Sequence, residues 1–497
     1  MKNKNYPYYD VPFVNDMKEL LDYCAENYGN KTAFWHGKGD KEIHHSYIDV
    51  RNDVALFATY LHSVGFAGKH IAILGENSYE WIVAYFAVVN MGGVVVPIDK
   101  ELDVESITAL LKRADVDLLI HSKAYTEEAA ATGFKTLSLN DTEEFISSGK
   151  NLITEGDSVY SDYSVDKETM CAIVFTSGTT GEPKGVMLSH KSLCSSAYGA
   201  AKNISVSGNS ILILPLYHLF GFTAGVLSEF YYGFGIYICN NSRRIIEDCQ
   251  TAKPQHFFAV PVMLENFLDR LNNPDNQSDT KLLATKECLD LIISGGAPLP
   301  EQLITSFSSI GITVLNGYGI TECSPIIATN RNLAYKKNSV GLPICTNTVS
   351  IINKQVAVKG ANVMLGYYKN NDATTAAFDS DWFKTGDLGF IDEDGFLFLT
   401  GRVNNLIVLS SGKNVSPEEL EALISNVDGV QEVVVYGNGN CITAEIFPQN
   451  GNMNLQEEIK KSVNMLNENL PMYKRITSIL FRNTEFEKTA TKKIKRQ

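Results

Sequence analysis

Residues 175–190, FTSGTTGEPKGVMLSH, place a loop of small and hydroxylated residues directly after a short apolar run. Small residues let backbone amides approach an anion closely, hydroxyl groups donate further hydrogen bonds, and Lys184 adds a positive charge at the exit of the loop. The loop lacks the G-x-x-x-x-G-K-[ST] spacing of a Walker A motif. A flexible surface turn is the plain alternative, but the combination of residue types favours a phosphate-binding loop.

Four further motifs follow in order: LPLYHLFG at 214–221, NGYGITE at 316–322, TGDLG at 385–389 and GR at 401–402. Taken singly they have ordinary explanations, since a lone histidine at a strand end is more often structural than catalytic and an aspartate after T-G often serves a turn. Together with TSGTTGEPKG the set resembles the adenylate-forming superfamily. That superfamily contains acyl- and aryl-CoA synthetases, firefly luciferase and the adenylation domains of peptide synthetases. The early segment 75–99 is similar to its fatty acyl-CoA synthetase branch.

This resemblance implies a two-step reaction. A carboxylate attacks the α-phosphate of ATP to give an acyl-adenylate and pyrophosphate, and the acyl group then passes to a thiol. Steps of this kind depend on positioning and on neutralising phosphate charge. The resemblance implies ATP and Mg²⁺ as cofactors and CoA as thiol co-substrate. The leading hypothesis is an AMP-forming acid–thiol ligase, and we expect its acid to be a medium- or long-chain fatty acid.

By the same resemblance, one group of residues holds the β- and γ-phosphates: Thr176, Ser177, Gly178, Thr179, Thr180, Gly181 and Lys184. In NGYGITE, Tyr318 offers a face to adenine next to Gly319, and Asn316 offers a hydrogen bond to the edge of the base. Thr321 is expected to contact the α-phosphate and Glu322 to ligate Mg²⁺.

The ribose and the acid are assigned in the same way. Asp387 is the expected partner of both ribose hydroxyls, because one carboxylate accepts two hydrogen bonds, and Arg402 adds a second contact. His218 is expected beside the substrate carboxylate and the thiol channel. The acyl pocket is expected to involve Phe222, Gly295, Gly296, Ala297 and Gly317. Peptide-synthetase domains carry an aspartate near His218, whereas LYHLFGFTAG has no acid, which favours an acid without an amino group.

The C-terminal part supplies the second step in this family by rotating about a hinge. An acidic hinge residue usually follows the G-R pair, but Asn404 and Asn405 stand there. In SSGKNVSP, Gly412 is expected to let the pantetheine arm pass. The ending EKTATKKIKR is similar to the family ending P-K-T-x-T-G-K-I-x-R, which makes Lys493 the catalytic lysine, although Lys492 replaces the glycine. A solvated basic tail is the alternative interpretation.

The elements that must hold these groups follow a clear order. Residues 44–98 alternate helical and strand-like runs, and the rhythm returns at 115–138 and from 171 to about 325, which predicts stacked, helix-covered α/β layers. Residues 347–400 contain short alternating strands, typical of a small β-barrel-like subdomain. We therefore predict an N-terminal domain over 1–403 and a smaller, mobile α+β domain over 404–497, with the hinge at 404–405.

Composition limits the remaining choices. With 497 residues the chain exceeds one hydrophobic core, and a net charge of −14 disfavours broad attraction to nucleic acid or anionic lipid. Nine cysteines without C-x-x-C spacing, no signal-like N-terminus and no transmembrane segment predict a cytoplasmic enzyme. Two alternatives stay open: an adenylating enzyme that loads the phosphopantetheine of an acyl or peptidyl carrier protein, and a nucleotide-binding homologue without turnover.

Overall fold

The computed structural model describes residues 6–176, 182–239, 241, 244–272, 289–409, 413–438, 441–488 and 494. The chain forms two compact units, which we describe separately. The large unit comprises Lys2–Val349 and Val358–Phe383, and the small unit comprises Ser350–Ala357 and Lys384–Gln497. The predicted boundary at 403/404 and the mobility of the C-terminal domain stay predictions.

The first sheet of the large unit has nine strands in the order β15-β14-β13-β12-β11-β9-β10-β1-β2. Pairing is parallel from β1 through β10, β9, β11 and β12 to β13, and antiparallel at β2, β14 and β15. The strands are β1 (Thr32–His36), β2 (Ile43–Ser46), β9 (Ser210–Leu212), β10 (Ile236–Ile238), β11 (His256–Ala259), β12 (Leu291–Ser294), β13 (Thr313–Gly319), β14 (Ile326–Thr329) and β15 (Leu342–Pro343).

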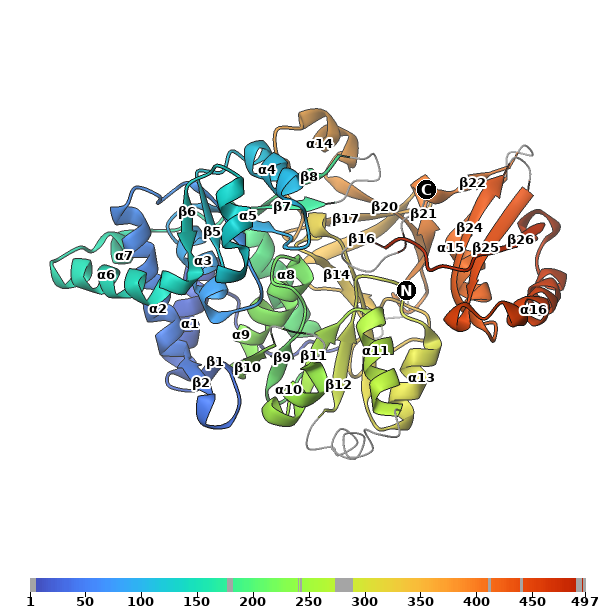
Figure 1. Cartoon of the computed structure of the whole chain (residues 1–497). Helices are drawn as coiled ribbons and strands as arrows, with labels where there is room; N and C mark the ends of the chain where they lie inside the picture. The colour runs from blue at the N-terminus through green and yellow to red at the C-terminus, as the bar shows by residue number, and fades with distance from the viewer. Residues whose placement is uncertain are drawn as a thin grey trace. The chain divides into compact units, whose positions relative to one another are not determined.

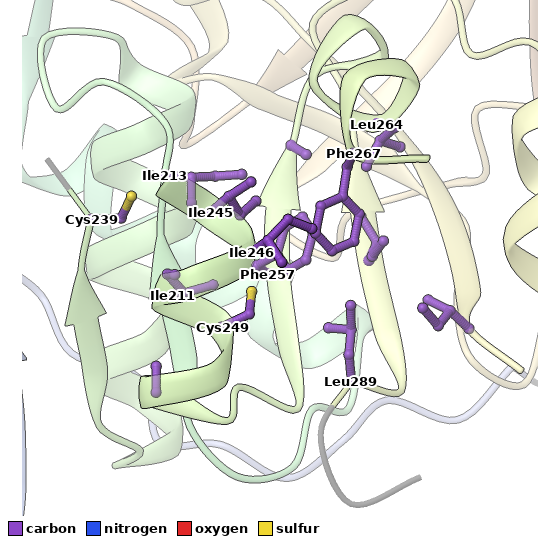
Figure 2. Close-up of a cluster of buried hydrophobic side chains, with 14 of the residues drawn as sticks. Ile211, Ile213, Cys239, Ile245, Ile246, Cys249, Phe257, Leu264, Phe267 and Leu289 are labelled. Carbon is purple, nitrogen blue, oxygen red and sulfur yellow. The ribbon is translucent and has the colours of Figure 1, made fainter. Parts of the chain in front are cut away.

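Helices cover this sheet and seal its core. They include α8 (His190–Asn203), the π-helical η4 (Phe220–Ser228), α9 (Glu229–Tyr232), α10 (Ile245–Ala252), α11 (Pro261–Asn272) and α13 (Glu301–Ser309). Figure 2 shows how side chains from β9, α10, β11 and α11 interlock around Phe257. A mostly parallel sheet covered by helices requires such a buried apolar cluster, and the close packing holds the carboxyl ends of the strands rigidly.

The second sheet of the large unit has seven strands in the order β18-β8-β7-β4-β3-β5-β6 (Figure 1). Its strands are β3 (His70–Leu74), β4 (Val94–Ile98), β5 (Leu118–His121), β6 (Thr136–Ser138), β7 (Met170–Thr176), β8 (Lys184–Ser189) and β18 (Gly366–Tyr367). Associated helices are α1 (Met17–Tyr28), α2 (Tyr47–Ser63), α3 (Tyr79–Val89), α4 (Val104–Arg113), α5 (Thr126–Ala131), α6 (Thr142–Thr154) and α7 (Val159–Asp162). Every residue of α3 except Glu80 in its first turn is buried, which explains why the rest of its sequence is apolar.

A five-stranded sheet contains β16 (Asn347–Ile352), β17 (Gln355–Gly360), β19 (Phe378–Asp379), β20 (Trp382–Ile391) and β21 (Leu397–Arg402), with α14 (Asn371–Ala377) before β19. Strands β16, β17 and β20 each begin in one unit and end in the other. This sheet agrees with the prediction of alternating strands over residues 347–400. The unit boundary therefore runs through strands rather than through a linker.

The remainder of the small unit is a three-stranded sheet with two helices. It contains β24 (Val430–Asn438), β25 (Cys441–Pro448) and β26 (Ser478–Phe481), the pair β22 (Ile407–Val408) and β23 (Asn414–Val415), and the helices α15 (Pro417–Ile424) and α16 (Gln456–Glu468). Helix α15 begins with Pro417 and carries two glutamates in its first turn, as its sequence predicts.

Candidate active site

The predicted phosphate loop joins two antiparallel strands. Thr176 at the end of β7 faces Lys184 at the start of β8. On the exit side, Arg113 donates a 2.6 Å hydrogen bond to the carbonyl of Pro183 and pairs with Glu182. The hairpin therefore fixes both ends of the loop, whereas Ser177, Gly178, Thr179, Thr180 and Gly181 lie outside the described residues.

Tyr367 connects the lysine of this loop to the predicted metal ligand. The Lys184 ammonium lies 5.1 Å from the centre of the Tyr367 ring, and the Tyr367 hydroxyl donates a 2.9 Å hydrogen bond to Glu322. Burial, followed by the charge of Glu322, raises the pKa of the Tyr367 phenol well above its ordinary value, so the hydroxyl remains a proton donor. The sequence prediction did not include Tyr367.

The motif NGYGITE ends strand β13 and continues into a tight turn, η7 (Thr321–Cys323). A side chain at Gly319 would place its Cβ 2.1 Å from the carbonyl oxygen of Pro325, so only glycine fits there. The carbonyl of Glu322 accepts a 2.8 Å hydrogen bond from the amide of Met364. This packing sets where Tyr318, Thr321 and Glu322 leave the sheet.

An apolar pocket of about 70 Å³ lies at the carboxyl ends of β11, β12 and β13. Its lining is Ala200, Ile204, Phe220, Ala224, Phe258, Ile293, Ser294, Gly295, Gly296, Gly317, Tyr318, Gly319, Pro325, Ile326 and Thr329. Three predicted pocket glycines are in this set, together with the predicted adenine partner Tyr318 and its neighbour Gly319. The hydroxyl of Ser294 is buried and has no hydrogen-bond partner among the described residues.

Two predicted pocket residues do not line this cavity. Phe222 is buried against α3, where its ring centre lies 3.8 Å from that of Tyr85. Its neighbour Phe220 lines the pocket instead and meets Phe258 edge to face at 6.0 Å. The two phenylalanines diverge because they occupy different angular positions on the π-helical turn of η4. Ala297, three residues after the buried Ser294, is also absent from the lining.

His218 is half-buried and comes just before η4. Its amide donates a 3.2 Å hydrogen bond to the carbonyl of Pro215, and its carbonyl accepts one from Phe222. A Cβ at Gly221 would lie 2.2 Å from the Pro215 oxygen, so glycine permits the close turn that starts the helix. The imidazole is 4.6 Å from the Tyr217 ring centre. Its catalytic role stays a prediction.

The predicted ribose-binding pair is formed within the small unit. Asp387 on β20 and Arg402 on β21 are opposite each other, and the Arg402 Nε donates a 2.6 Å hydrogen bond to Asp387. The Asp387 carboxylate is 8% exposed and its amide binds the Thr385 hydroxyl, which in turn donates to Val356. The carboxylate is thus held in a fixed orientation by its charged partner and its own backbone.

The hinge prediction falls on a short turn, η8 (Val403–Asn405), directly after β21. The side-chain amide of Asn405 donates to the Glu418 carboxylate in the first turn of α15, and Ser416 donates to the same side chain at 2.8 Å. Gly412 and Lys493 lie outside the described residues. Ile494, which follows Lys493, pairs with Lys488 and packs against Phe486, Val434 and Phe447.

The described residues form neither a metal-binding cluster nor a membrane-spanning helix. Within those ranges, no three side chains of the histidine, cysteine, aspartate and glutamate types gather to hold a metal ion. Over the same part of the chain, none of the helices combines the length and apolar character needed to cross a bilayer.

Comparisons with known proteins agree with this architecture. Residues 21–368 match the family described as "AMP-binding enzyme" and residues 404–497 match the "AMP-binding enzyme C-terminal domain". A 2-succinylbenzoate–CoA ligase of Oceanobacillus iheyensis is 28% identical over 80% of this chain and 81% of the relative. A long-chain-fatty-acid–CoA ligase of Bacillus subtilis is 26% identical over 98% of this chain and 95% of the relative.

Among solved structures, o-succinylbenzoate coenzyme A synthetase from Bacillus subtilis, in complex with ATP and a magnesium ion, has a TM-score of 0.77. It shares 22% identity, and the match covers 96% of this chain and 98% of that one. The prediction of a mixed α/β fold with a larger N-terminal and a smaller C-terminal domain is confirmed. Since the family match spans most of the sequence, this chain belongs to the AMP-binding enzyme family, the adenylate-forming superfamily that its motifs predict.

Proposed function

We propose that this chain is an acid–thiol ligase that activates a carboxylic acid with ATP and passes the acyl group to CoA. One observation carries the proposal. Lys184, Tyr367 and Glu322 form a connected polar group, and the strand that leads to Glu322 also supplies Gly317, Tyr318 and Gly319 to the wall of an apolar pocket. The groups that we assign to phosphate and to the acid thus lie near the carboxyl end of β13, where ligands of open α/β sheets are expected.

The residues present suit Mg-ATP. Lys184 supplies a positive charge for phosphate oxygens, while Tyr367 orients one carboxylate oxygen of Glu322. Mg²⁺ is commonly held by one or two carboxylates together with substrate phosphates, so Glu322 would hold it without a further protein cluster. The bound ion would supply neutralisation of phosphate charge during attack by the acid. Asp387, with Arg402, would bind the ribose hydroxyls.

The pocket supports an acid with an apolar tail and no amino group. None of the described residues in its lining is charged, so a buried ammonium group would lack an ionic partner. Its volume of about 70 Å³ is small beside the roughly 300–1,000 Å³ of pockets for larger ligands. A medium- or long-chain fatty acid, which remains our proposed substrate, therefore requires Phe220 and Phe258 to move.

The relatives support the general reaction and leave the acid open. Those compared above are named as CoA ligases for 2-succinylbenzoate and for long-chain fatty acids, and a structural neighbour was solved with ATP and a magnesium ion. Both names describe the joining of a carboxylic acid to CoA, but the acid differs between them. Transfer to a carrier protein and a cytoplasmic location both stay predictions.

The test is a product analysis. Purified protein is incubated with Mg-ATP, CoA and a panel of fatty and aromatic acids, and acyl-AMP and acyl-CoA are followed by mass spectrometry. We expect acyl-CoA from the wild type, its loss in Glu322→Gln and Lys493→Ala, and its retention in Lys461→Ala, which removes an exposed lysine of α16. Acyl-AMP without acyl-CoA would indicate a carrier-protein acceptor. Neither product from any acid would overturn the proposal in favour of a nucleotide-binding protein.

A further inference from the structure

A second cavity, of about 300 Å³, lies in the large unit beside the N-terminal segment of the described chain. Its lining is Tyr6, Pro7, Tyr9, Asn203, Arg331, Leu333 and Ala334. It shares no lining residue with the acyl pocket. Arg331 is the charged member of this lining, and it is only 3% exposed. A nearly buried guanidinium at the wall of a cavity of ligand size calls for a chemical explanation.

The guanidinium is held in place by neutral groups. Its Nη1 donates to the carbonyls of Tyr6 and Pro7 at 3.0 and 3.3 Å, and its Nη2 donates to the Asn203 side chain at 2.9 Å. The Tyr8 ring covers one face, with its centre 4.2 Å from the guanidinium carbon. The backbone of Arg331 is fixed by a reciprocal pair of hydrogen bonds with Ala334. The side chain is therefore preorganised rather than free to swing into solvent.

In this arrangement one N–H donor of Arg331 has no acceptor among the described residues, and its positive charge faces no carboxylate there. Arginine has five N–H donors, and its Nε here has no hydrogen-bond partner among the described residues. Its partners in those residues are carbonyl and amide oxygens and the Tyr8 side chain, none of them a carboxylate. Burial lowers the pKa of Arg331, which reflects the cost of holding the charge away from water. Buried charges are normally paired, so an anion is the ligand class that this guanidinium would favour.

A second cation acts on the same region. The ammonium of Lys202, the residue before Asn203, lies over the Tyr198 ring at 5.4 Å. Burial raises the pKa of the nearby Cys345 thiol, and the charges of Lys202 and Arg331 act on that thiol in the opposite direction. Two cations therefore act on one site here, although the chain as a whole carries a net charge of −14.

We propose that this cavity is a binding site for a small anion, a carboxylate or a phosphate group, held by the Arg331 guanidinium. The planar fork of arginine suits both groups. The site is distinct from the acyl pocket, but the two are connected, because Asn203 also donates a 3.1 Å hydrogen bond to Thr329, which lines that pocket. The proposal does not depend on the acid–thiol ligase reaction.

Isothermal titration calorimetry of the whole chain tests the proposal. Sodium phosphate and sodium acetate are titrated separately at constant ionic strength, with chloride as the replaced anion. We expect saturable binding of at least one anion at a single site, and the two arms tell phosphate from carboxylate. Lys184→Ala is expected to keep this signal, which separates it from phosphate bound at the nucleotide loop. Absence of saturable binding for both anions would overturn the proposal.

Two matched substitutions at Leu333 test the site without changing Arg331. Its side chain lines the cavity and is 76% exposed, so polar replacements should be tolerated. Leu333→Glu brings a tethered carboxylate to Arg331 and should weaken anion binding at least about tenfold by competition. Leu333→Gln has nearly the same shape without the charge and should bind as the wild type does. Equal binding by both folded variants, checked by their melting temperatures, would refute the assignment.

Discussion

The Tyr367 hydroxyl donates a 2.9 Å hydrogen bond to the Glu322 carboxylate, although 45 residues separate the two in sequence. Tyr367 belongs to the short strand β18, which pairs with β8, the strand that begins with Lys184. Tyr367 therefore contacts residues of two different motifs, Lys184 of the phosphate loop and Glu322 of NGYGITE. Its ring lies against the lysine and its hydroxyl orients the glutamate, so one side chain positions both groups that we assign to Mg-ATP.

Removal of this hydroxyl should weaken the use of Mg-ATP. Tyr367→Phe keeps the ring beneath Lys184 but leaves Glu322 without its donor, and hydrogen bonds to charged groups are worth about 1.5–3 kcal/mol. We expect kcat/KM for Mg-ATP to fall at least ~10-fold, with a higher Mg²⁺ concentration needed for half-maximal rate. Steady-state kinetics at varied Mg²⁺ measure both.

The adjacent tyrosine gives the matched control. The Tyr368 hydroxyl binds Asp115 at 2.7 Å on the exposed surface, away from Glu322. Tyr368→Phe should leave the Mg²⁺ dependence as in the wild type. An unchanged Mg²⁺ dependence in Tyr367→Phe would show that Glu322 needs no positioning by this phenol.

Enlarging the apolar pocket should shift the preferred acid toward longer tails. Phe258→Ala removes a ring that closes the pocket against Phe220. The space freed is a few methylene groups, and each buried methylene contributes about 0.8 kcal/mol, so kcat/KM for an acid two carbons longer should rise ~10-fold relative to the best acid of the wild type. A chain-length series of saturated acids measures the shift.

A variant of Phe222 tests whether this residue lines the acyl pocket, as its sequence position suggests, or only packs in the core, as the structure shows. Its ring packs on Tyr85 rather than on the pocket, so Phe222→Leu should lower stability by about 1 kcal/mol while the preferred acid stays the same. If Phe222→Leu changed chain-length preference and Phe258→Ala did not, the described pocket would not be the acyl site.

Replacement of Asn405, at the predicted hinge, by the acid usual in this family should lower stability. Asn405 donates from its amide to Glu418, whose carboxylate also accepts from Ser416. Asn405→Asp would oppose two carboxylates, and like charges in contact raise a carboxyl pKa and destabilise the fold that contains them. We expect Asn405→Asp to lower the melting temperature, relative to the wild type at the same pH, more at pH 8 than at pH 5, because protonation at low pH relieves the repulsion.

Two further measurements complete this test. Asn405→Ala loses the hydrogen bond without adding charge, so its melting temperature should not show this additional drop at high pH. Separate single-turnover rates for acyl-AMP formation and for acyl-CoA formation show whether the variant affects the second step, as expected of a hinge. Equal stability of Asn405→Asp and wild type across this pH range would mean that Glu418 does not constrain this turn.

Local residue patterns predicted a phosphate loop directly after a strand, a nucleotide-binding motif at NGYGITE, and Asp387 and Arg402 as ribose partners. In each case the chemistry depends on neighbours in sequence or on a simple hairpin register, and the register does place Asp387 opposite Arg402. Only the structure shows Tyr367 at Glu322, because that contact arises from pairing of β18 with β8 and no local spacing encodes it.

Phe222 illustrates a different limit of sequence interpretation. Its position shortly after His218 suggested a pocket residue, but η4 is π-helical, so residues two apart point in directions that an α-helical or strand period does not anticipate. The Arg331 cavity is a third case, since its walls come from the N-terminal segment, the end of α8 and the loop after β14. Only tertiary packing brings these three segments together.

The buried His190 should make the large unit sensitive to mild acid. It begins α8, is 1% exposed, and its Nδ1 accepts a 3.4 Å hydrogen bond from the amide of Met17 at the start of α1. Burial lowers the pKa of His190 to about 4, against smaller opposing effects of the Val89 carbonyl and Asp166. The positive end of α8 also disfavours the imidazolium.

The sign of the effect follows from proton binding. The unfolded chain takes up a proton near the ordinary histidine pKa of about 6.5, whereas the folded chain does not until pH is near 4, so stability present above about pH 6.5 is lost as pH falls. Between pH 7 and pH 5 the loss due to His190 should be about 2 kcal/mol. Urea unfolding of the wild type should show this decrease, and His190→Gln should lack it. His44→Gln, which removes an exposed histidine beside Glu42, should behave as the wild type does; a wild-type slope retained in His190→Gln would assign the acid sensitivity to other groups.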